Sequence, residues 1–113
     1  MATTVLTLLA DGFEEIEATS PIDLLRRADA EVTVASCSDR LEITGRSEIT
    51  LRADYLLTDI EDPLGFDMLV LPGGPAVFEL RKRPEIIDLI GNFGHTGKPI
   101  GAICAAPLLL LDA

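Results

Sequence analysis

The sequence is poor in metal-binding side chains and in positive charge. Its 113 residues include one histidine, two cysteines and nine basic residues, against 19 acidic ones. One histidine and two separated thiols provide no zinc-ligand cluster, so we expect no metal site. The formal net charge of −10 repels nucleic-acid phosphates and anionic membrane surfaces. This charge argues against direct nucleic-acid binding.

Long apolar runs, low-complexity tracts and internal repeats are also missing. No segment is long enough to span a membrane, so we expect no membrane partner. The apolar stretch from Met1 to Ala10 lacks a basic leader and is followed by acidic residues, which favours a first strand over a secretory signal. We therefore expect a cytoplasmic protein in which Cys37 and Cys104 stay reduced and form no disulfide.

Alternating strand-like and helix-like segments predict one α/β domain over residues 1–113. Strands are expected at residues 4–9, 31–36, 68–71 and 99–103, with a hairpin excursion formed by 41–43 and 49–53. One helix is expected to end at Ala28, a second to run from Pro84 to Phe93 or Gly94, and residues 58–65 to form an acidic loop. This alternation is typical of a parallel sheet whose ligand site lies at the carboxyl ends of its strands.

The first predicted helix contains Pro21, which cannot donate a hydrogen bond to the carbonyl of Glu17. The proline is tolerated when Glu17 lies in the first turn, at the carboxyl edge of the sheet. Asp29 stands where this helix ends and is expected to adopt a left-handed conformation at some energetic cost. Glu14 and Glu15 are interpreted as solvated residues or as favourable charges at the helix start.

The most informative segment runs from Lys98 to Pro107, where an apolar strand leads through small residues to Cys104 and a helix-compatible run. The small neighbours leave room for a tight strand-to-helix turn with backbone N–H groups around the sulfur, as in a nucleophile elbow. A helix N-terminus beside the thiol favours the thiolate. From the residues alone, the alternative is a structural cysteine buried on an apolar strand.

Two further strand ends carry candidate site residues, namely Asp11 to Glu17 and Pro72-Gly73-Gly74. The ordered set Glu-Glu-Ile-Glu, Leu-Pro-Gly-Gly and Ala-Ile-Cys-Ala-Ala-Pro resembles the ThiJ/PfpI superfamily, most closely the branch of the parkinsonism-associated deglycase and its bacterial relatives. The resemblance spans Val5 to Leu111. It implies a parallel-sheet sandwich of the flavodoxin-like, class I glutamine amidotransferase-like type.

The same resemblance implies a cysteine-dependent glyoxalase or deglycase, a hydrolase of carbonyl and oxidative stress defence. Its substrates would be small methylglyoxal- or glyoxal-type carbonyls or their glycated adducts, without glutathione or another cofactor. Cys104 would attack the carbonyl while Glu17 hydrogen-bonds to the sulfur and moves a proton. The backbone at Gly73, Gly74 and Ala105 would bind the substrate and stabilise the developing oxyanion.

Other functions remain open at this point. Cys104 is also suited to a non-catalytic redox sensor or chaperone that uses an oxidisable cysteine. An intracellular cysteine peptidase of the same superfamily is a further alternative. The glutamine amidotransferase branch fits less well, because Ala105-Ala106-Pro107 follows the cysteine in place of its usual glycine and glutamine.

The apolar end of the sequence, Leu108 to Ala113, predicts a domain that is incomplete at its C-terminus. We expect truncation or nicking near Ala113, with a companion C-terminal fragment or missing segment carrying the histidine found in many family members. His95 falls in a glycine-flanked turn before the Cys104 strand and is interpreted as a surface residue. Cys37 is interpreted as an incidental small residue.

The basic residues form only short clusters, at Arg26-Arg27 and at residues 81–83, which are interpreted as solvated helix ends or surface loops. The resemblance implies a homodimer, and it points to Arg26, Arg27 and Arg46 as residues near that interface.

Overall fold

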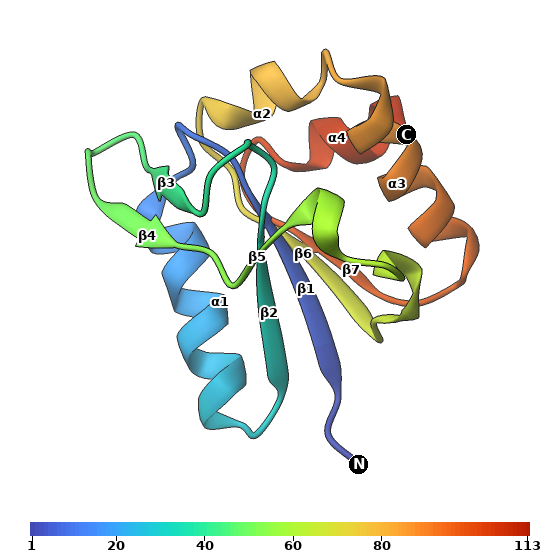
Figure 1. Ribbon diagram of the computed structural model, residues 1–113. Coiled ribbons are helices and arrows are strands. Elements are labelled where there is room, and N and C mark those ends of the chain that lie inside the picture. The colour runs from blue at the N-terminus through green and yellow to red at the C-terminus, as the bar shows by residue number, and fades with distance from the viewer.

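Five strands form the central sheet of the computed structural model, which describes residues 1–113 (Figure 1). Its strands lie in the order β5-β2-β1-β6-β7, and every neighbouring pair is parallel. They are β1 (Thr4–Leu9), β2 (Glu31–Ser36), β5 (Tyr55–Leu56), β6 (Met68–Leu71) and β7 (Ile100–Ala102). The predicted parallel α/β fold is confirmed.

Helices cover both faces of this sheet (Figure 1). One face packs against α1 (Glu15–Arg27), and the other packs against α2 (Ala76–Leu80), α3 (Pro84–His95) and α4 (Pro107–Asp112). The strands supply both cores because alternate side chains point to opposite faces. Val5 and Val70 belong to the α1 side, whereas Leu6 and Leu69 belong to the core under α3.

The chain reverses its direction across the sheet at β1. It first adds β2 and β5 on one side of β1, and it then returns to add β6 and β7 on the other side. In open α/β sheets, ligands bind outside the carboxyl ends of the strands at such a switch point. The segments following β1 and β6 therefore occupy the position where a site is expected.

Helix α1 ends as the sequence predicts. Asp29 has a φ of +67°, so an aspartate occupies a left-handed position that glycine adopts at lower cost. The N–H of Asp29 donates to the carbonyl of Arg26, and the N–H of Ala30 donates to that of Leu25. This pair of hydrogen bonds defines a Schellman ending.

Other parts of the fold differ from the sequence prediction or extend it. The expected acidic loop contains two 3-10 turns, Leu57–Asp59 and Pro63–Gly65, and Ile60 packs against the core. The short elements α2 and β5 were not predicted, because five and two residues are too few to show a periodic pattern. The predicted hairpin is present as β3 (Glu42–Thr44) and β4 (Thr50–Arg52). No helix combines the length and the apolar character needed to cross a membrane.

Candidate active site

Cys104 lies in the turn that joins β7 to α4. Its φ of +58° is unusual for a residue with a side chain, and the residue is exposed. The N–H of Ile103 donates to the carbonyl of Leu71 at 3.2 Å, and the N–H of Ala106 closes the turn on the carbonyl of Ile103 at 2.9 Å. This strained strand-to-helix turn has the form of the predicted elbow and leaves the Cys104 side chain exposed.

Glu17 lies in the first turn of α1, as its spacing from Pro21 predicts. The side chain of Glu14 caps this turn by accepting a hydrogen bond from the N–H of Glu17 at 2.9 Å. Glu17 is partly buried, and its Oε1 accepts the N–H of Gly73 at 3.0 Å. The carboxylate is therefore held at the end of β6, the strand that pairs directly with β7.

Gly73 brings Glu17 and Cys104 to one place. A Cβ at this glycine would come within 2.5 Å of Glu17 Oε1, 2.8 Å of the Ile103 carbonyl oxygen and 3.1 Å of Cys104 Cβ. The absence of a side chain at Gly73 therefore leaves the space in which the carboxylate and the cysteine approach each other. Three segments far apart in the sequence meet here, each following a different strand of the sheet.

Gly74 and Ala105 lie on the turns that follow β6 and β7. Gly74 has a φ of +100°, and a Cβ there would meet the backbone N of Glu14 at 2.6 Å and the carbonyl oxygen of Gly12 at 2.8 Å. The backbone N–H groups of Gly74 and Ala105 donate no hydrogen bond within the fold. Both N–H groups are therefore available to a ligand oxygen.

Glu15 corrects one interpretation made from the sequence, because it is not solvated. Only 6% of the residue is exposed, and its Oε2 accepts the N–H groups of Ser47 at 2.8 Å and Ile49 at 3.2 Å. Gly45 provides the space, since a Cβ there would lie 2.4 Å from the Glu15 carboxylate. Its second oxygen, Oε1, is buried without a partner.

The ionisation of Glu15 follows from this setting. Burial raises the pKa of the carboxyl, but backbone hydrogen bonds from Glu15 itself, Ile49 and Ser47 lower it and outweigh the burial. The charge of Arg46 lowers it further, so the pKa lies below its ordinary value. Helical spacing offered a signal for this role, because Glu15 lies on the same face as Ala18, which is buried.

The remaining candidate residues lie elsewhere. His95 ends α3, is exposed, and stands at the amino end of the strand whose carboxyl end carries Cys104, as predicted. Cys37 is buried just beyond β2, and this burial raises the pKa of its thiol to about 12. No group of three or more His, Cys, Asp or Glu side chains is placed to hold a metal ion.

Together, the fold and the converging segments define an α/β protein with an exposed cysteine at a strand-to-helix elbow, a carboxylate and two free backbone donors. Residues 3–113 match the DJ-1/PfpI family. The chain belongs to this family, so the resemblance noted in its motifs is confirmed.

Curated relatives include proteins named as deglycases. The chain is 38% identical over 109 residues to a deglycase of Thermococcus kodakarensis, covering 96% of this chain and 64% of that protein. It is 33% identical over 114 residues to protein/nucleic acid deglycase 2 of Escherichia coli, covering all of this chain and 66% of that protein. The chain thus spans about two thirds of the length of these relatives.

Solved structures show the same fold. DJ-1beta of Drosophila melanogaster superimposes with a TM-score of 0.92 at 33% identity, over 99% of this chain and 60% of that one. Oxidized DJ-1 of Toxoplasma gondii gives a TM-score of 0.88 at 37% identity, over 96% of this chain and 59% of that one. The flavodoxin-like arrangement of the strands is therefore shared with DJ-1 proteins.

Proposed function

We propose that this chain carries the reactive cysteine of a glyoxalase or deglycase that acts on methylglyoxal- or glyoxal-type carbonyls or their adducts. The observation that carries the proposal is the convergence of Cys104, Glu17 and Gly73 at the carboxyl edge of the sheet. Relatives named as deglycases support the reaction class. The proposed setting is carbonyl and oxidative stress defence in the cytoplasm, without a cofactor.

The proposed chemistry begins with attack of the Cys104 sulfur on the carbonyl carbon. A C–S bond forms while the carbonyl π electrons move to oxygen, which is stabilised by the N–H groups of Gly74 and Ala105. As the C–S bond forms, the proton of the Cys104 thiol passes to the Glu17 carboxylate, which the N–H of Gly73 holds in place, and Glu17 then returns this proton to the new alkoxide oxygen to give a neutral hemithioacetal. The free N–H groups stabilise the negative oxygen more than the neutral carbonyl, which lowers the barrier.

Turnover of methylglyoxal by the full-length polypeptide tests this proposal. Cys104→Ser should abolish turnover, and Glu17→Gln should lower it strongly, because each variant removes one reacting group. Cys37→Ala is the matched control, since this second cysteine is buried away from the elbow. Turnover that survives in Cys104→Ser would contradict the proposal.

A redox sensor is the second candidate function, and the exposure of Cys104 favours it. An exposed thiol at this turn is accessible to peroxide, and oxidation to a sulfenic or sulfinic acid would place new oxygens near the free N–H groups. The two functions separate in one pair of measurements. A Cys104 thiol that is oxidised by stoichiometric peroxide while methylglyoxal is not turned over would favour the sensor.

We also propose a homodimer formed through α1. Ile16 and Leu24 are two helical turns apart, and 71% and 61% of their surfaces are exposed, so this face of the helix is apolar and open. Arg46 makes no ion pair within the chain, whereas Arg27 pairs with Asp23. Sedimentation of an Ile16→Asp variant tests this surface, since the charge should convert a dimer into monomers.

A further inference from the structure

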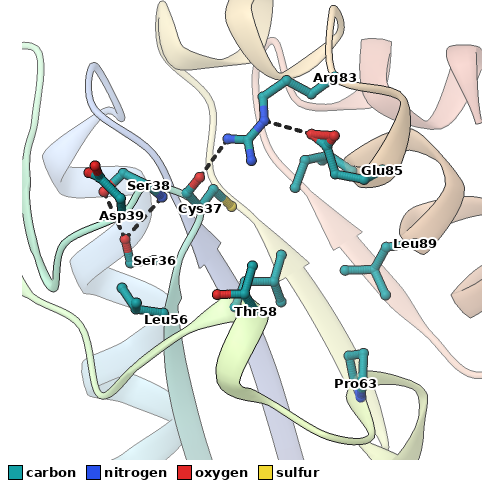
Figure 2. A pocket seen from close by; sticks show the side chains of 12 residues that line it. Ser36, Cys37, Ser38, Asp39, Leu56, Thr58, Pro63, Arg83, Glu85 and Leu89 are labelled. Atoms are coloured by element: carbon teal, nitrogen blue, oxygen red, sulfur yellow. Dashed lines mark hydrogen bonds and ion pairs between the residues drawn. The ribbon is translucent and has the colours of Figure 1, made fainter.

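A cavity with a volume of about 720 Å³ is lined by residues outside the elbow site (Figure 2). It lies between the loop after β2, the two 3-10 turns and the start of α3. Cys37 lines it from the first segment, Thr58 and Pro63 from the second, and Arg83 and Leu89 from the third. A cavity of this size accommodates a small organic molecule.

Arg83 forms one side of the cavity, and some of its N–H groups donate no hydrogen bond within the chain. Its Nη1 donates to the carbonyl oxygen of Cys37 at 2.5 Å, and its Nε donates to Glu85 Oε1 at 2.8 Å, as the dashed lines in Figure 2 show. A guanidinium has five N–H donors, so three remain unused. The hydroxyl of Thr58, on the opposite side of the cavity, also makes no hydrogen bond within the chain. Donors for a ligand oxygen therefore exist beside the cavity.

The inner wall of the cavity is apolar and uncharged. Ile86 is fully buried, and Leu57 and Leu89 pack against the same core. Only 5% of Cys37 is exposed, and no hydrogen bond involves its sulfur. Burial keeps this thiol neutral because it raises the pKa to about 12, with the nearby Glu85 acting in the same direction and Arg83 opposing it. The wall thus suits the apolar body of a ligand.

The charges around the cavity select against an anion. The positive charge of Arg83 is compensated by Glu85, with which it forms an ion pair at 2.8 Å. Asp39, at the rim, is paired with Arg40 at 3.6 Å, and 95% of its side chain is exposed. A carboxylate would lose its hydration without meeting an unbalanced positive charge. A cation would in turn find no unpaired carboxylate, because Glu85 is paired with Arg83 and Asp39 with Arg40.

We propose that this cavity is a binding site for a neutral organic molecule that carries an amide or a similar uncharged hydrogen-bonding group. The apolar body lies against Ile86 and Leu89. The carbonyl oxygen of the ligand accepts hydrogen bonds from the unused N–H groups of Arg83. This site is separate from the elbow site, and its occupancy does not depend on the reaction proposed there.

Three probes of matched shape test the proposal on the full-length polypeptide: 2-naphthamide, 2-naphthoate and 2-naphthylmethylamine. Binding is followed by chemical shifts in NMR spectra and by the alkylation rate of Cys37, read at the level of its peptide by mass spectrometry. The amide should bind saturably with a Kd of about 1 mM, as expected for a ligand of this size. The two charged probes should bind at least about tenfold more weakly.

Variants locate the binding in this cavity. Cys37→Leu should abolish binding of 2-naphthamide because the larger side chain fills the inner wall. Arg83→Lys keeps the charge but loses the planar guanidinium and its paired N–H donors, so it should weaken binding about fivefold or more. This variant takes the place of Cys37→Leu in the test if Cys37→Leu does not fold. Cys104→Ser should leave binding unchanged. The absence of saturable shifts, tighter binding of 2-naphthoate, or loss of binding in Cys104→Ser would each overturn the proposal.

Discussion

The substitution Gly73→Ala tests the geometry of the elbow site with the smallest possible change. The added methyl group would lie 2.5 Å from Glu17 Oε1 and 2.8 Å from the carbonyl oxygen of Ile103, whereas ordinary contacts begin near 3.4 Å. The carboxylate must therefore move by about 0.9 Å, and the carbonyl of Ile103, which belongs to the turn that holds Cys104, by about 0.6 Å. A displacement of about 1 Å typically costs about 100-fold in rate. Overpacking should also lower the free energy of unfolding by about 1–3 kcal/mol.

The assay is kcat/KM for methylglyoxal together with urea denaturation of the same full-length samples. Gly94→Ala is the matched control, because this exposed glycine lies in α3 and the nearest atom to its Cβ is 3.9 Å away. The control should keep its activity and gain up to about 1 kcal/mol, since alanine favours the helix. If Gly73→Ala retained activity within about threefold of the unmodified protein, the packing of Glu17 against this glycine would have no catalytic importance.

Three further predictions concern stability. The folded thiol of Cys37 has a pKa of about 12 against an ordinary 9.0, so the unfolded state ionises first as pH rises. The free energy of unfolding, measured by urea denaturation between pH 8 and 10, should fall by about 1.4 kcal/mol per pH unit above pH 9. The control Cys37→Ala should show no such slope. Asp29→Gly should raise the free energy of unfolding by about 1 kcal/mol, because the residue has a φ of +67°; unchanged stability would show that the aspartate is not strained. Because folding lowers the pKa of Glu15, its contribution to the free energy of unfolding is fully present above the pKa that the residue has in the unfolded state. The contribution is lost as pH falls through the lower pKa of the folded state. Glu15→Gln should therefore reduce the loss of stability at low pH and still fold normally, because one side-chain oxygen accepts both backbone N–H groups. A thermal melt in which Glu15→Gln is as destabilising as Glu15→Ala would refute this.

The convergence of the elbow residues could be predicted from the sequence because a parallel sheet imposes it. Glu17, Gly73 and Cys104 each follow a strand, and the carboxyl ends of parallel strands meet at one edge. The small residues around Cys104 and the glycine pair after β6 added the local turn geometry. The strand order itself placed this site at the switch point between β1 and β6.

Features that depend on contacts between distant segments could not be predicted in the same way. Glu15 was interpreted as solvated or as a favourable charge at the helix start, and it does lie in the first turn of α1. Its burial could not be predicted, because its partners, the N–H groups of Ser47 and Ile49, lie more than 30 residues away on a hairpin turn. Only the folded chain shows that Gly45 leaves the space for its carboxylate. The cavity beside Arg83 has the same origin, since its walls come from three separate segments and no local motif marks them.

The two cysteines show how the backbone, and not the residue type, decides the chemistry of a thiol. Both follow a strand of the same sheet, Cys37 after β2 and Cys104 after β7. The N–H of Cys37 continues the strand ladder by donating to the carbonyl of Leu9 at 2.8 Å, so its side chain follows the alternation of the strand into the core. Cys104 instead leaves the strand with a φ of +58°, which turns its side chain out of the core. The exposure of Cys104 and the burial of Cys37 thus follow from one difference in backbone conformation.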